Sequence, residues 1–318
     1  MVSALSKVIG VLIASFCLSA QEPGFGSKSD TPDTASEVQM ATLKELLPAN
    51  PFVIRAEKVE EILRVSGMEM EELLSQLMPI ARSFARTPIS GYNVGEAALG
   101  KSGNIYLGIN LEFAGLPLNA AVHGEQFLVV NARSHGEREI VMISLPAAPC
   151  GHCRQFLNEM DEGESLQILT PNNPPETLAF FLPNAFGPKD LGLKAGLLDQ
   201  SSECPSFAQE SPLTRKALEA AFFSYAPYSR SKSGVAVETM EGKIYTGSYL
   251  ENAAFNPSLS PLQAALVALV MDLRAYEEIR EVILVEQRRA LISQEAPTRA
   301  LLESIAPHAH FKLEKRDF

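Results

Sequence analysis

Four residues in the first half of the chain have the types and spacing of a metal-dependent hydrolytic site. His123 and Glu125 lie two positions apart, Cys150 follows 25 residues after Glu125, and Cys153 three residues later. One imidazole and two thiolates supply three zinc ligands and leave the fourth tetrahedral position for water, as in catalytic zinc sites. Glu125 is placed to reach that water without being a ligand, which makes it the candidate proton shuttle.

The motifs around these residues narrow the chemistry. A His-x-Glu motif followed by Pro-Cys-x-x-Cys, present here at 123–125 and 149–153, is the signature of zinc-dependent nucleobase deaminases. Cys150 and Cys153 fall on one face if a helix begins there, and the positive end of that helix favours thiolates over thiols. The sequence therefore predicts one catalytic Zn²⁺ per chain.

A Cys-x-x-Cys pair alone has two other interpretations, a redox pair and half of a structural zinc site. A redox pair leaves His123 and Glu125 without a role. A structural site needs a fourth ligand, and the nearest candidates are unsuited: His152 lies between the cysteines, where it is expected to point away, and Cys204 lies in a predicted linker. These considerations favour the catalytic interpretation.

Alternating strands and helices must position these residues. Apolar residues spaced three and four apart predict helices, and short apolar runs separated by Gly-containing turns predict strands. The order strand, helix, strand, helix indicates an α/β layer with parallel pairing. The expected elements are amphipathic helices around 59–63 and 73–84, a hairpin of 93–99 and 104–109, a helix over 119–131, a buried strand over 140–145 and a helix over 150–160.

An internal repeat organises the chain. At 318 residues its length already suggests two domains. Shifted by 139 positions, residues 88–125 fall on 227–264 without a gap, and eleven of these 38 positions are identical. Chance at average composition gives roughly two or three. The second half is therefore predicted to be a duplicated copy of the first fold.

The repeat also tests the metal site. At the same offset His123 falls on Leu262 and Glu125 on Ala264, and no cysteine follows Cys204. The second copy is thus expected to keep the fold without the ligands. A metal needed only to stabilise this fold would be hard to lose in one copy. The zinc of the first copy is accordingly predicted to be functional.

Seven longer stretches carry a resemblance to a known family. They are ARTPISGYNVG (85–95), NLEF (110–113), HGEQ (123–126), APCGHCRQF (148–156), LPNAFGPKDL (182–191), SYAPYS (224–229) and YLENAAFNPSLSPLQAAL (249–266). With them the chain resembles the two-domain, homodimeric cytidine deaminases of bacteria and plants, from about residue 51 to its C-terminus.

The resemblance implies an α/β fold, the three-layer α/β/α arrangement of cytidine deaminases, duplicated after a small helical N-terminal segment. In that family the second copy is degenerate and lacks zinc, in agreement with the repeat. The predicted organisation is a signal-like apolar segment (1–20), a disordered linker (21–50), a helical segment (51–87), a catalytic zinc domain (88–165), a linker (166–211) and a degenerate deaminase-like domain (212–318).

The resemblance also assigns roles to single residues. His123, Cys150 and Cys153 match the zinc ligands of the family, and Glu125 matches its catalytic acid-base. Asn110 and Glu112 match the pair that hydrogen-bonds the ribose 3′-hydroxyl. Because a carboxylate at this position would repel a phosphate, the pair favours a free nucleoside over a nucleotide.

Four further positions complete the expected site. Tyr92 falls where the family has an aromatic residue, usually Phe, against the pyrimidine, and Phe186 matches a second aromatic residue near the base. Gly124 replaces the usual Ala between His and Glu and keeps its backbone N–H available to the substrate. Arg154 follows the second cysteine and is expected to hydrogen-bond a zinc thiolate, although a solvated helix arginine is an equal alternative.

The N-terminal segment leaves two interpretations. Lys7 precedes an apolar run over 8–18 and small residues at 19–20, the outline of a secretory signal peptide that is too short to span a membrane. Alternatively the segment is an uncleaved tail or a gene-model extension, since Met40 offers another start. No other stretch has the length and apolarity of a span, so we expect a cytoplasmic protein without a membrane partner, unless the segment is a cleaved signal.

These observations predict hydrolytic deamination of cytidine and 2′-deoxycytidine to uridine and 2′-deoxyuridine by a homodimer. The formal charge of −11 opposes binding to a phosphate backbone, so nucleic acid is not expected as a partner. Two alternatives remain: a polynucleotide or modified-base deaminase with the same zinc centre, and an inactive zinc-stabilised binding module.

Overall fold

The computed structural model describes residues 34–317, and its first four elements are three helices with one short strand between the first and the second. The expected signal-like segment and the linker up to residue 33 lie outside the described residues. From residue 34 the prediction of a disordered linker is wrong, because α1 (Thr34–Leu46) packs on α2 (Ala56–Ser66) and buries Leu43 completely. Met40, Leu43 and Leu47 form an apolar stripe at helical spacing, which the polar composition upstream had masked.

The helix pair expected around 59–63 and 73–84 is confirmed. It consists of α2 and α3 (Met70–Arg82), each with one buried apolar face. Val59 and Ile62 supply that face in α2, and Leu73 and Leu77 supply it in α3. The 3.6-residue period was therefore a reliable signal in this region.

The first copy is built on a six-stranded sheet of order β1-β3-β2-β4-β5-β6. The predicted hairpin is confirmed as the antiparallel pair β2 and β3, and the predicted parallel pairing occurs between β4 and β5. The strands are β1 (Val53–Ile54), β2 (Gly95–Gly100), β3 (Ile105–Ile109), β4 (Ile140–Ser144), β5 (Gln167–Leu169) and β6 (Glu176–Thr177).

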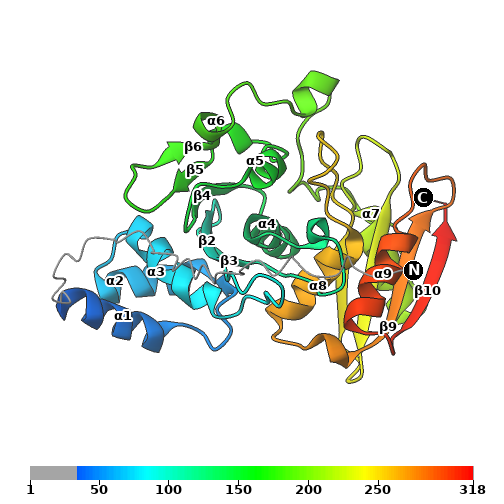
Figure 1. Ribbon diagram of the computed structural model, residues 1–318, viewed down its shortest axis with the longest axis horizontal. Coiled ribbons are helices and arrows are strands. Elements are labelled where there is room, and N and C mark those ends of the chain that lie inside the picture. The colour runs from blue at the N-terminus through cyan, green and yellow to red at the C-terminus, as the bar shows by residue number, and fades with distance from the viewer. Residues whose placement is uncertain (1–33, 318) are drawn as a thin grey trace, which may run out of the picture.

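Helices cover both faces of this sheet. Figure 1 shows the strands between α3 on one side and α4 (Gly124–Ser134) on the other, which is the expected three-layer arrangement. The helix expected over 119–131 begins only at residue 124, because Leu118–Ala120 forms a separate 3-10 turn. The helix expected over 150–160 is α5 (Gly151–Leu157), so both site-bearing helices start at the motif residues.

The second copy repeats the strand order of the first. Its sheet runs β10-β9-β7-β8, with β9 and β10 parallel, which corresponds to β5-β4-β2-β3. The predicted duplication of the fold is thereby confirmed. Its elements are α7 (Pro212–Phe222), β7 (Ser233–Thr239), β8 (Ile244–Ser248), α8 (Pro261–Met271), β9 (Ile279–Gln287), α9 (Glu295–Ile305) and β10 (His310–Arg316).

The match between the copies has a gap that the sequence comparison missed. Up to Leu111 and Leu250 the offset is 139, but the bridges Leu111–Val122 and Leu250–Leu259 show that it then becomes 137. The second copy lacks two residues in the intervening loop. The structural counterpart of His123 is therefore the helix cap Ser260, and that of Glu125 is Leu262. Neither Ser260 nor Leu262 reproduces the His-x-Glu pair, so the second copy still lacks it.

The predicted linker 166–211 is partly wrong, since it contains β5, β6 and α6 (Leu178–Phe181) of the first copy. These elements are too short for a periodic pattern to reveal them. Leu178 and Leu197 from this stretch are buried in a hydrophobic core that the two copies share. Among residues 34–317, no helix combines the length and apolar character needed to cross a membrane.

Helices α4 and α8 pack side by side where the copies meet, and two glutamines are exchanged across this contact. Gln126 Nε2 donates to the Pro257 carbonyl at 3.1 Å, and Gln263 Nε2 donates to the Ala120 carbonyl at 2.7 Å. With the offset of 137, each bond is the counterpart of the other. The contact next to His123 therefore has approximate twofold symmetry.

Candidate functional site

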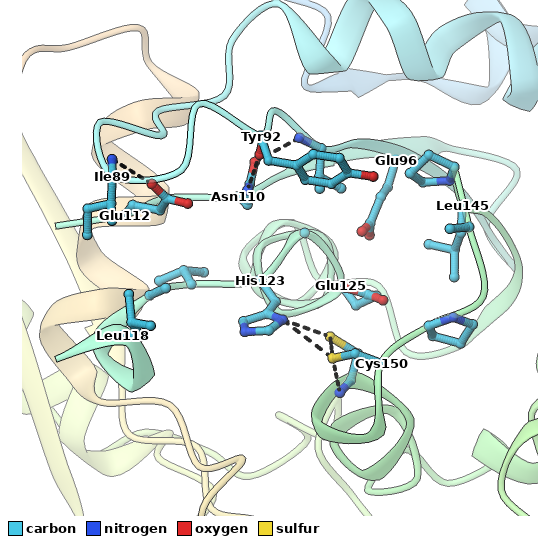
Figure 2. Close-up of a pocket in the computed structure, with 18 of the residues that line it drawn as sticks. Ile89, Tyr92, Glu96, Asn110, Glu112, Leu118, His123, Glu125, Leu145 and Cys150 are labelled. Carbon is cyan, nitrogen blue, oxygen red and sulfur yellow. Dashed lines mark hydrogen bonds between the residues drawn. The ribbon is translucent and has the colours of Figure 1, made fainter. Parts of the chain in front are cut away.

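The three predicted metal ligands meet at the N-termini of two helices. His123 is the cap residue of α4 and Cys150 the cap residue of α5, where its sulfur accepts the Cys153 N–H at 3.5 Å. The Cys150 and Cys153 sulfurs lie 3.4 Å apart, and His123 Nδ1 lies 3.6 and 3.4 Å from them (Figure 2). Zinc bonds of 2.0–2.3 Å in a tetrahedron place neighbouring ligand atoms about 3.3–3.8 Å apart. The observed triangle has the size that zinc requires.

The electrostatics of the cluster also suit a cation. Hydrogen bonds from Cys153 and then from His123 lower the pKa of Cys150 to about 3. The same bond with Cys150, together with burial, raises the pKa of Cys153, so the protein alone holds a single thiolate here. A bound dication deprotonates a coordinating thiol outright. The donor set therefore gains its second thiolate with the metal, as a zinc site does.

Glu125 lies in the first turn of α4, beside the ligands but outside the group of three that converge. Its side chain is 6% exposed and faces the same cavity (Figure 2). The spacing of two residues from a helix cap explains this placement, because the first helical turn carries Glu125 to the side of His123. The arrangement places a carboxyl group next to the predicted metal position.

The site opens into a cavity of about 400 Å³. This volume lies in the range of small-molecule pockets. Four of the five residues expected to contact substrate line it, namely Tyr92, Asn110, Glu112 and Gly124. Phe186 does not: it lies outside the cavity with 48% of its surface exposed, and its carbonyl accepts a hydrogen bond from Gln155 Nε2 at 2.6 Å. Within one chain Phe186 therefore does not contact the cavity, and its expected role near the base stays a prediction.

Asn110 and Glu112 both hold the loop that carries Tyr92. Asn110 accepts the Val94 N–H through Oδ1 at 2.9 Å and donates to the Tyr92 carbonyl at 2.9 Å. Glu112 accepts the backbone N–H groups of Ile89 and Ser90, each at 2.9 Å, and the Ser90 hydroxyl at 2.5 Å. Burial alone would raise the pKa of Glu112, but these hydrogen bonds outweigh it and lower the pKa, which keeps the group ionised.

Arg154 has different partners from those expected. Its Nε donates to the Pro149 carbonyl at 2.6 Å and its Nη1 to the Phe181 carbonyl at 2.7 Å. Its guanidinium also lies over the Phe181 ring, 5.5 Å from the centroid. The planar group thus finds two carbonyls and an aromatic face instead of a sulfur. Arg154 supports the residue before Cys150 and makes no hydrogen bond to either thiol.

Two residues of the site were missed in the sequence. His152 does not turn away from the cluster, because its ring stacks on that of His123 with centroids 4.6 Å apart. Glu96 from β2 lines the cavity with only 1% of its surface exposed. Within the strand pattern Glu96 was an isolated polar residue among apolar ones, and a buried position of this kind is the signal that could have identified it.

Comparisons with known proteins agree with this geometry. Residues 68–166 and 178–299 each match a family model described as the cytidine and deoxycytidylate deaminase zinc-binding region. Proteins named cytidine deaminase from Yersinia pestis (strain Pestoides F) and Yersinia pseudotuberculosis serotype O:1b (strain IP 31758) are 47% identical over 255 residues, which cover 80% of this chain and 87% of theirs.

Two solved structures add shorter matches. The cytidine deaminase from Mycobacterium tuberculosis is 29% identical with a TM-score of 0.35 and covers 38% of this chain and 99% of its own. The enzyme from Burkholderia pseudomallei is 27% identical with a TM-score of 0.34 and covers 37% and 100%. Given its two family matches and the Yersinia relatives that share most of its length, the chain belongs to the zinc-binding cytidine and deoxycytidylate deaminase family, in a two-domain form.

Proposed function

We propose that the protein catalyses the hydrolytic deamination of cytidine and 2′-deoxycytidine to uridine and 2′-deoxyuridine, with release of ammonia. One observation carries the proposal: the same cavity holds the His123, Cys150 and Cys153 cluster with Glu125, and also Asn110 and Glu112. The first set suits attack on a base, and the second suits recognition of a sugar. The Yersinia relatives carry the name of this activity.

His123, Cys150 and Cys153 would hold the zinc, whose chemistry is to lower the pKa of water so that hydroxide forms near neutral pH. Glu125 takes the proton of the attacking water and delivers it to N3 of the pyrimidine, which makes C4 electrophilic. Glu125 then takes the proton of the hydroxyl group added at C4 and passes it to the amine, so that the C4–N bond breaks, the C4 carbonyl forms and ammonia leaves. One carboxylate thus acts as base and as acid in turn. Tyr92 packs against the ring, and Asn110 and Glu112 bind the ribose 3′-hydroxyl.

The test is an assay of cytidine deamination, in which the loss of ultraviolet absorbance by cytidine is monitored. Wild type is expected to bind one zinc per chain and to convert cytidine. Glu125→Ala is expected to keep its zinc, because Glu125 is not a ligand, and to lose almost all turnover. A wild type that binds zinc but leaves the spectrum unchanged would support the binding module instead. Near-normal turnover by Glu125→Ala would disprove the assigned role.

A polynucleotide substrate is disfavoured by charge. The chain carries a formal charge of −11, and the ionised Glu112 lines the cavity where a phosphate would have to pass. Cytidine is therefore expected to react much faster than a single-stranded oligonucleotide at equal cytosine concentration. The reverse order of rates would make the polynucleotide deaminase the better description.

We also propose that the enzyme is a cytoplasmic homodimer. Tyr92 and Leu118 line the cavity yet are 62% and 75% exposed, so apolar side chains lie at its mouth where a second subunit would cover them. Light scattering of the purified protein is expected to give twice the mass of one chain.

The cytoplasmic location has a separate test. N-terminal sequencing of protein from its own cell is expected to find a chain that starts at Met1 or near Met40, and a start near residue 21 would indicate secretion.

A further inference from the structure

Glu96 places a second carboxyl group beside Glu125. It extends from β2 across the cavity wall, and Figure 2 shows its carboxyl directed toward the start of α4, where Glu125 lies. The residue is 1% exposed, and its Oε2 has no hydrogen-bond partner. Buried polar groups are nearly always paired, so an unpaired carboxyl oxygen at a reaction site calls for an explanation.

Gly124 is what makes room for this side chain. A Cβ atom added at Gly124 would lie 2.2 Å from Oε1 of Glu96 and 2.5 Å from its Cδ. Such distances are far inside van der Waals contact. The alanine that is usual between His and Glu in this family could not coexist with Glu96 in this position. Gly124 and Glu96 therefore form one structural feature, in which a carboxyl group occupies the space of a missing methyl group.

The local charges favour a neutral Glu96. Burial raises the pKa of this carboxyl well above its usual range, and the neighbouring Glu125 raises it further. Two adjacent buried carboxyl groups cannot both ionise cheaply, and the one in the more apolar position keeps the proton. A neutral carboxylic acid is a hydrogen-bond donor.

We propose that Glu96 is a positioning residue for Glu125: its buried carboxyl group, packed against the start of α4, hydrogen-bonds the carboxyl group of Glu125 and fixes that group toward the reacting atoms. The proposal rests on the proposed deamination, in which Glu125 must reach first the water and then the base. Glu96 has almost no exposed surface in the cavity, so it acts through Glu125 and not on the substrate.

The first experiment tests the fit between Glu96 and Gly124, independently of activity. Gly124→Ala, Glu96→Ala and the double variant are compared with wild type by thermal unfolding and by zinc content. Gly124→Ala is expected to lower Tm because the new Cβ strikes Glu96, and in the Glu96→Ala background the same change is expected to have little effect. Such a coupling identifies residues in contact. Equal Tm losses in both backgrounds would refute the fit.

The second experiment tests positioning. The double variant Glu96→Ala and Gly124→Ala restores the packing without the carboxyl, so a loss of activity cannot be ascribed to a cavity. We expect it to bind one zinc and to retain KM for cytidine while kcat falls by about tenfold or more, the scale of a misplaced catalytic group. Glu96→Gln can still donate and is expected to keep kcat close to that of wild type.

Two results would overturn the positioning role. One is a double variant with the kcat of wild type, and the other is a Glu96→Gln variant that loses as much as the double variant. A wild type that does not deaminate cytidine refutes the proposed function instead, and in that case the unfolding experiment still decides whether Glu96 and Gly124 fit together. Failure of the two proposals can therefore be told apart.

Discussion

The Glu112 carboxylate lines the cavity and also accepts the backbone N–H groups of the turn at Ile89 and Ser90. The second copy preserves only the structural half of this arrangement. There Glu251 accepts the N–H groups of Tyr228 and Ser229 at 2.8 and 3.1 Å, but the residue two positions before it is Tyr249 instead of an asparagine. A single chain thus offers both a candidate site residue and its structural control.

We predict that Glu112→Gln and Glu251→Gln destabilise the protein to a similar extent and differ in catalysis. Each loses a charged acceptor that serves three donors, which costs on the order of 1.5–3 kcal/mol in the free energy of unfolding. Only Glu112→Gln is expected to raise KM for cytidine, by about tenfold for one hydrogen bond to the sugar. Urea unfolding and steady-state kinetics measure both. An equal rise of KM in the two variants would show that the effect is structural.

Removal of the metal is predicted to stop the reaction without unfolding the chain. The second copy holds the same fold without any of the three ligands, so the fold does not depend on them. Cys153→Ser is expected to lose zinc and turnover while its circular dichroism remains that of wild type. Cys204→Ser, distant from the cluster in sequence, is the control and should retain one zinc. Global unfolding of Cys153→Ser would contradict this prediction.

At the scale of elements, glycines in the strands beneath them set how closely helices α4 and α8 approach the two sheets. A Cβ at Gly108 in β3 would lie 2.6 Å from the Gly124 carbonyl oxygen, and one at Gly247 in β8 would lie 2.1 Å from the Pro261 carbonyl oxygen. The backbone of α4 therefore lies as close to β3, and that of α8 as close to β8, as a glycine without a side chain allows.

We predict that Gly108→Ala and Gly247→Ala both cost about 1–3 kcal/mol of stability, because each pushes a helix start away from its sheet. Gly108→Ala moves the turn that carries His123 and Glu125, so zinc affinity and kcat should fall as well. In Gly247→Ala the helix carries no ligand, and activity per folded molecule should be unchanged. Zinc titration with kinetics at a temperature where both variants are folded would distinguish them, and loss of activity in both would contradict the assignment.

The sequence was informative for most elements that are long enough to show their period, with α1 as the exception. The 3.6-residue pattern found α2 and α3, and the hairpin of β2 and β3 followed from a Gly-containing turn between apolar runs. Strands of two or three residues, such as β5 and β6, carry no period, so their segment was misjudged as linker.

The metal ligands could be predicted from a motif and did not depend on a periodic pattern. Ligand chemistry fixes both residue type and spacing, so His123, Cys150 and Cys153 were identifiable from the motif alone. Glu96 was not, because its role depends on a tertiary contact with Gly124, 28 positions away. The partners of Arg154 could not be predicted for the same reason, since one of the two carbonyl groups that it binds belongs to Phe181.

At the scale of the whole molecule, the two copies are joined by a buried carboxyl group. Glu159 follows α5 in the first copy and is 0% exposed. It accepts hydrogen bonds from Tyr225, Tyr228 and the Ala253 N–H of the second copy at 2.6–3.1 Å. Burial raises the pKa of Glu159 despite these bonds.

This shift predicts a pH dependence of stability. Between the unfolded value of about 4.5 and the higher folded pKa, the folded chain keeps a proton that the unfolded chain has lost. The contribution of Glu159 is thus fully present below the unfolded pKa and declines as the pH rises to the folded pKa. The Tm of Glu159→Gln should therefore rise relative to the Tm of wild type as the pH increases from about 4.5 through this window. Parallel Tm curves would exclude the predicted proton linkage.

The reciprocal bonds of Gln126 and Gln263 bear on how such a chain arose. An exchange in which each half offers the other the same group is the geometry of an isologous pair, in which one surface meets its own copy. When the gene of a protein that already forms a dimer is duplicated and fused, both halves of the product carry the pairing surface. No new interface then has to evolve. Afterwards selection had to maintain the surface in both halves but the chemistry in only one. The division of labour in this chain is therefore what an ancestral dimer would leave behind after fusion.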